Sequence, residues 1–94
     1  MTKKYTLGKY IFVAPSTRKN KKYDVYNAKT GAKIASFGAI KTDGTPYQQF
    51  KDVVGHYSKY DHGEPARRKR YRVRHAGENE VVESAGWFAW KYLW

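Results

Sequence analysis

The sequence predicts an α+β domain, in which a small antiparallel sheet of three to four strands is followed by two C-terminal helices packed on it. In the first half of the chain, β-branched and aromatic residues form short runs separated by turn residues, which is typical of strands. In the second half, Pro65 and Ser84 stand where helices would begin, and both residue types are favoured there. We expect a basic flexible arm at residues 1–8 and one domain over 9–94, because 94 residues supply one small core.

Three segments predict an antiparallel meander: Lys9–Val13, Lys22–Asn27 and Lys33–Phe37. A basic turn, Pro15–Asn20, joins the first two segments. Gly31 lies in the next turn, and glycine adopts the positive φ that tight turns require.

The segment Tyr47–Val54 has two interpretations. It could be a fourth strand that pairs with the third, or a short helix, since its large apolar residues fall at i, i+3 and i+7. The glycines at positions 44 and 55 bracket it closely, and we therefore expect the strand.

The Arg-rich segment predicts the first helix. Pro65 suits the first helical position, Glu64 places negative charge at the positive end of the helix dipole, and Gly77 follows as a stop. Residues 70–75 also alternate with the period of a strand. The proline and the good helix propensity of arginine favour the helix.

The second helix is expected from Ala85, with Ser84 as its N-cap. Its aromatic residues cannot remain in water, so this helix must pack on the sheet. Three tryptophans are expected to serve the structure along one helix face: Trp87, Trp90 and Trp94.

Positive charge is the strongest functional signal. The net charge is +11, and six of the eight residues from 67 to 74 are Lys or Arg. Such a field favours nucleic acid, an anionic membrane or an acidic protein surface. The expected polyanion-binding residues are Arg67, Arg68, Lys69, Arg70, Arg72, Arg74, Arg18, Lys19, Lys21 and Lys22.

Catalysis is not indicated. A divalent-metal set of the kind found in nucleases could be formed by Asp52, Asp61, His56, His62 and His75. However, no HExxH, HNH-like or phosphate-loop spacing occurs. We expect no catalytic residue, bound metal or cofactor.

Asp61 is expected to pair with Arg68 or Arg72, and some arginines to neutralise the glutamates of residues 78–83. His62 and His75 are expected to brace the two ends of the Arg-rich helix.

Cysteine is absent, so neither disulfides nor thiolate zinc sites can reinforce the fold. No apolar run is long enough to span a bilayer, and the first residues lack the apolar core of a signal peptide. We therefore expect no transmembrane segment and no secretion.

Several motifs follow one another along the chain: Phe37-Gly38, the acidic-His step Asp61-His62, the Arg-rich segment ending in Tyr71-Arg72-Val73-Arg74-His75, and the aromatic end Leu93-Trp94. Over residues 22–94 the chain resembles a small uncharacterised basic domain encoded by large DNA viruses of algae and protists. The resemblance implies a viral origin and a compact, non-enzymatic role in or around the particle.

These observations together favour a minor capsid or virion-associated protein, located in the virion or the host cell interior. It would dock on acidic capsid proteins or on packaged DNA, without a small-molecule substrate. The alternative is a sequence-nonspecific nucleic-acid-binding protein, which would use backbone contacts because no base-reading motif occurs. A metal-dependent nuclease is a weaker alternative.

Overall fold

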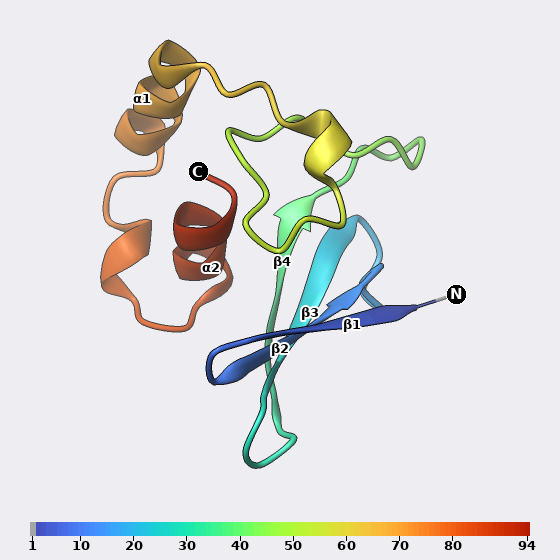
Figure 1. The fold of residues 1–94 in the computed structure, drawn as a ribbon. Coiled ribbons are helices and arrows are strands. Elements are labelled where there is room, and N and C mark those ends of the chain that lie inside the picture. Colours follow the sequence, from blue (N-terminus) through green and yellow to red (C-terminus); the bar gives the residue numbers. More distant parts are fainter. Residues whose placement is uncertain (1) are drawn as a thin grey trace.

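The computed structural model describes residues 2–94, which form a sheet followed by two helices (Figure 1). The strands are β1 (Lys3–Leu7), β2 (Tyr10–Ala14), β3 (Lys21–Asn27) and β4 (Lys33–Ala39). The helices are α1 (Pro65–Arg74) and α2 (Ala85–Tyr92), and 3₁₀ turns occupy Ser58–Tyr60 and Glu78–Glu80. The predicted α+β class is confirmed.

The sheet is an antiparallel meander with the strand order β1-β2-β3-β4. Tyr10 lies opposite Asn27 in the β2–β3 pair, and Tyr23 lies opposite Phe37 in the β3–β4 pair. The three predicted strands correspond to β2, β3 and β4, with each boundary within two residues of its expected position.

The prediction of a flexible arm was wrong for residues 3–7. They form β1 and pair with β2, from Lys3 opposite Ala14 to Leu7 opposite Tyr10. Tyr5 and Leu7 are half-buried while their neighbours are exposed, which is the alternation of an edge strand. Met1, also part of the expected arm, lies outside the described residues.

The prediction of a strand at Tyr47–Val54 was also wrong, and the segment is an irregular loop. Two of its backbone N–H groups bond to the end of α2, since Lys51 N donates to Leu93 O at 3.0 Å and Val53 N to Tyr92 O at 2.9 Å. One bond reaches β4, from Tyr47 N to Ala39 O at 3.1 Å, so no ladder forms with that strand.

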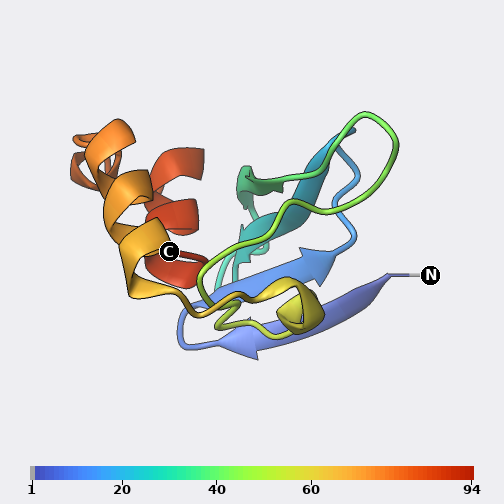
Figure 2. The same ribbon diagram turned by 90° about the horizontal axis from the view of Figure 1, so that it is seen from above.

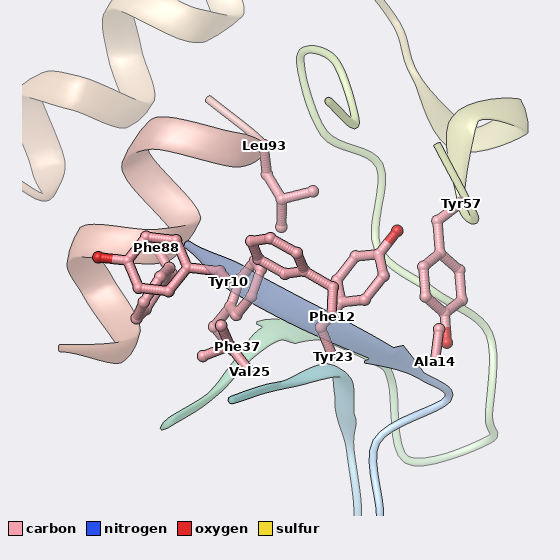
Figure 3. Packing of buried hydrophobic residues seen from close by; sticks show 9 residues of the cluster. All are labelled: Tyr10, Phe12, Ala14, Tyr23, Val25, Phe37, Tyr57, Phe88 and Leu93. Atoms are coloured by element: carbon pink, nitrogen blue, oxygen red, sulfur yellow. The ribbon is translucent and has the colours of Figure 1, made fainter. Parts of the chain in front are cut away.

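Aromatic side chains from the sheet and from α2 form the core (Figure 3). Tyr10, Phe12 and Ala14 alternate inward along β2. The Phe88 side chain enters from α2, with its ring centroid 5.1 Å from that of Tyr10 and 5.5 Å from that of Phe37. Phe88 is completely buried, whereas the tryptophans of the same helix are only half-buried.

The two helices lie on one side of the sheet, and α2 is the one beside it, with α1 outside α2 (Figure 2). Ser84 caps α2 as predicted, because its Oγ accepts a hydrogen bond of 3.1 Å from Trp87 N. None of the described helices is long and apolar enough to cross a membrane.

Asp24 is buried on the face of β3 opposite the core. Burial alone would raise the pKa of this carboxyl group, but hydrogen bonds from Ser16, Ser36 and Thr17 together lower it below its usual range. The carboxylate therefore fastens the β2–β3 turn to β4.

Gly38 in β4 packs closely against the Lys22 side chain of β3, and a substitution at Gly38 tests this contact. Its φ is +84°, and a Cβ at this position would lie 2.8 Å from Lys22 Cβ. Gly38→Ala is expected to lower the free energy of unfolding by more than the ~1–3 kcal/mol typical of a strained backbone. The matched control is Gly31→Ala, which has a φ of +77° and no atom within 4 Å of the added Cβ. Equal losses of stability in urea denaturation would contradict the proposed clash.

Candidate functional site

The Arg-rich segment forms α1, as predicted. Pro65 lies in the first turn, and the backbone N–H of Glu64, the N-cap residue, donates to His62 Nδ1 at 3.0 Å. His75 is the C-cap, and Gly77 follows with a φ of 96°, which glycine tolerates. The two histidines thus lie at the two ends of α1, where they were expected.

A column of stacked rings attaches α1 to the end of α2. The Tyr71 ring lies 4.2 Å from the Trp94 ring and 4.1 Å from the His75 ring, centroid to centroid. Burial, helped by the charge of Glu78, raises the pKa of Tyr71 to about 12. Arg72 Nη2 also donates to Trp94 O at 3.0 Å.

Two arginines of α1 pack against aromatic rings. The guanidinium carbon of Arg68 lies 4.9 Å from the Phe50 centroid, and that of Arg72 lies 5.2 Å from the Trp90 centroid. Both side chains are only half-exposed. Their positive charge is therefore partly used to hold α1 in place by cation–π contact.

Three of the other four cations of α1 face solvent. Lys69, Arg70 and Arg74 are exposed. Arg67 is half-buried, and its Nη1 donates to Gln48 Oε1 at 3.0 Å and to Glu64 Oε2 at 3.4 Å. Across residues 2–94, the Arg67–Glu64 pair is the one ion pair that involves a Lys or Arg of α1. Most of the charge on α1 is thus left without a carboxylate partner.

The expected pairing between these arginines and the glutamates of residues 78–83 was wrong. His75 Nδ1 hydrogen-bonds Glu78 Oε2, and Tyr10 OH donates to Glu83 Oε2 at 2.5 Å. Glu78 and Glu83 therefore bond to groups other than the arginines of α1.

A cleft of about 510 Å³ lies between α1 and the ends of β3 and β4. Its lining includes the cationic residues Lys21, Arg67 and Arg74 and the aromatic residues Tyr47, Tyr71 and Trp94. Small residues such as Gly38 and Gly86 also line it. The cleft therefore combines positive charge, ring faces and open space.

The four polyanion-binding residues predicted in the N-terminal half have different environments. Arg18 and Lys19 are exposed in the β2–β3 turn, and Lys21 is half-buried beside the cleft. Lys22 was wrongly assigned to the polyanion surface, because it is only 1% exposed. Its Nζ donates to Tyr47 O at 2.7 Å and to Gln49 Oε1 at 2.5 Å.

Asp61 has a structural role, but its expected arginine partners were wrong. Its Oδ1 accepts hydrogen bonds from Gln49 Nε2 at 2.6 Å and from Asp52 N at 2.9 Å. Gln49 Nε2 also donates to Tyr57 O at 2.9 Å. The carboxylate thus closes the 47–61 loop on itself.

The carboxylates that suggested a metal site are occupied by the protein. Asp52 accepts hydrogen bonds from Tyr23 OH and from the backbone N–H groups of Gly55 and Tyr57. Within residues 2–94, no group of three His, Asp or Glu side chains is placed to hold a metal ion.

Sequence reasoning missed Tyr47 and Gln48 as residues of the cleft, because both fell in the predicted strand. Tyr47 is 50% exposed, and Gln48 meets Arg67 across 19 positions of sequence. The only signal in the sequence was a tyrosine, Tyr47, directly after a turn, and this signal does not predict the cleft by itself.

Comparison of the chain with protein-family models, curated proteins and solved structures finds no match. Function must therefore be inferred from the charge and the geometry of the surface.

Proposed function

We propose that this protein is a small, non-enzymatic virion protein that binds the phosphate backbone of the packaged genome through α1 and the adjacent cleft. One observation carries the proposal: Lys69, Arg70 and Arg74 are exposed, and none of them forms an ion pair within residues 2–94. A polyanion relieves the repulsion among such charges, and their binding to phosphates releases the counterions condensed on the nucleic acid.

The binding should be independent of base sequence. Arginine and lysine heads on a helix surface contact phosphate oxygens readily, and phosphate contacts carry no sequence information. The viral location rests on the resemblance of the Arg-rich and aromatic motifs to the viral domain.

The test replaces the three exposed cations of α1 together. Lys69→Ala/Arg70→Ala/Arg74→Ala is expected to weaken duplex DNA binding roughly tenfold to hundredfold near 0.15 M salt. The slope of log affinity against log salt should fall by ~0.9 for each phosphate that the variant no longer neutralises. Fluorescence anisotropy over a salt series measures both quantities, and unrelated duplexes should show the same decrease in affinity.

The control is Lys3→Ala/Lys29→Ala/Lys59→Ala, which removes the same charge from three exposed lysines outside α1. It should retain most of the slope. A decrease as large as that of the α1 variant would show that only net charge matters, and would overturn α1 as the binding surface.

Docking on an acidic capsid protein is the second candidate, and one observation favours it. Val73 is 68% exposed among the cations of α1. Burial of an apolar side chain stabilises contact with a protein surface more than contact with phosphate. This candidate predicts that the protein stays, in fixed ratio to the major capsid protein, in particles emptied of genome. Loss of the protein together with the genome supports the nucleic-acid proposal instead.

A further inference from the structure

The cleft beneath α1 differs in shape and chemistry from the exposed surface of the helix. Its rim carries Arg67 and Arg74 from α1 and Lys21 from β3. The small apolar residues Ala85 and Ala89 of α2 also line the cleft. A phosphate-bearing ligand could place its charge at the rim and its apolar part inside.

The ring of Tyr47 is the accessible aromatic surface of this cleft. It is 50% exposed, whereas Tyr71 already has Trp94 and His75 on its two sides. The Lys41 ammonium lies 5.4 Å from the Tyr47 centroid, so positive charge accompanies the ring. An exposed ring beside cations is the arrangement on which unpaired bases stack in single-strand-binding proteins.

The neighbouring Gln48 can contribute a polar contact. Its Oε1 accepts from Arg67 Nη1 at 3.0 Å, and its amide nitrogen donates to no residue in the described part of the chain. Glu78 is the acidic residue of the lining, and His75 hydrogen-bonds it. The remaining charge of the cleft is positive, which suits a phosphate group.

The size of the cleft favours unpaired over paired nucleic acid. A volume of about 510 Å³ lies within the range of pockets for single small ligands, ~300–1,000 Å³. A base in a duplex is stacked and paired, so it can enter such a space only after it has been flipped out. A single strand presents its bases without that cost.

We propose that the cleft binds one unpaired nucleotide of a single-stranded nucleic acid, with the base on Tyr47 and the flanking phosphates on Arg67, Arg74 and Lys21. The inference rests on the proposed function and deepens it, because it names single strands as the preferred ligand. The exposed cations of α1 then contact phosphates on either side of the bound nucleotide.

The experiment compares a labelled dT15 oligonucleotide with a duplex of equal phosphate number, by anisotropy under one salt condition. Wild type should bind dT15 more tightly. Tyr47→Ala should lose roughly tenfold or more in affinity for dT15, on the scale of one stacked base, and little for the duplex. Tyr47→Phe keeps the stacking face and should restore dT15 binding. Arg74→Ala, a second variant, should weaken both ligands.

Each outcome decides a separate point. Equal affinity of wild type for the two ligands, with no effect of Tyr47→Ala, overturns the cleft as a nucleotide site and leaves the proposed function standing. Absence of salt-dependent binding to either ligand overturns both. Stronger binding to poly-glutamate than to either nucleic acid redirects the site to an acidic protein. Circular dichroism and thermal unfolding verify that each variant is folded.

Discussion

Phe88→Ala is expected to lower the free energy of unfolding by about 3–5 kcal/mol, the range typical of a buried phenylalanine. Phe88 is completely buried, and its ring contacts rings from β2 and β4 (Figure 3). Its removal takes away apolar packing and leaves a cavity where α2 meets the sheet. A domain of this size has only ~5–15 kcal/mol of stability in total, so the variant should be close to unfolding.

Urea denaturation followed by tryptophan fluorescence measures this loss of stability. Val82→Ala is the control, because Val82 is 70% exposed and should change stability by no more than ~0.5 kcal/mol. Phe88→Leu should fold and be destabilised less than Phe88→Ala, and provides a measurable variant if alanine prevents folding. A destabilisation below ~1 kcal/mol for Phe88→Ala would mean that α2 does not anchor the sheet.

The central meander could be predicted because its information is local. Phe12 and its neighbours in β2 alternate with the period of a half-buried strand, and Gly31 supplies the turn before β4. Ser84 is likewise a local signal for the start of α2, because its hydrogen-bond partner, Trp87 N, lies only three residues away.

The two errors at the sheet edges have a physical reason. β1 carries only Tyr5 and Leu7 as inward residues among lysines and threonine, so its pattern resembles that of a solvated arm. The loop around Gln49 is ordered by groups distant in sequence, including Lys22 and Asp61. No local pattern contains such contacts.

The candidate site was predictable in composition and not in geometry. The sequence identifies α1 as basic, but the separation of Arg68 and Arg72 from the exposed cations depends on Phe50 and Trp90, which lie far away in sequence. The burial of Lys22 likewise depends on a loop that begins 25 residues later.

The buried Lys22 should make the protein more stable as the pH rises from about 8 to 9. Burial lowers the pKa of Lys22 from 10.5 to about 8, although the charges of Asp52 and Asp61 oppose the shift. Between these two pKa values the folded state holds a neutral amine while the unfolded chain holds an ammonium. The unfolded state then binds more protons, so the free energy of unfolding rises with pH.

The expected gain has a ceiling of about 3 kcal/mol, because each unit of pKa difference corresponds to ~1.4 kcal/mol. A neutral amine still has two N–H groups, enough for the bonds to Tyr47 O and Gln49 Oε1. The folded contacts therefore survive deprotonation.

Tyrosines limit the gain at higher pH. Burial raises the pKa of Tyr71 to about 12 and raises the pKa values of Tyr10, Tyr23, Tyr57 and Tyr92 as well. As the pH approaches the ordinary tyrosine pKa of about 10, the unfolded chain loses these phenolic protons before the folded protein does, so stability falls again. The stability curve should therefore have its maximum below pH 10, at about pH 9.

Urea midpoints measured between pH 7 and 11 test this expectation, with Lys22→Met as the variant. Methionine keeps much of the apolar stem but cannot titrate, so the rise between pH 8 and 9 should disappear, whatever the stability of the variant at pH 7. Lys21→Met is the matched control: it removes the neighbouring, half-buried lysine and leaves Lys22 in place, so the rise should persist. A wild-type midpoint that stays flat or falls from pH 8 to 9 would show that Lys22 is hydrated in the folded protein.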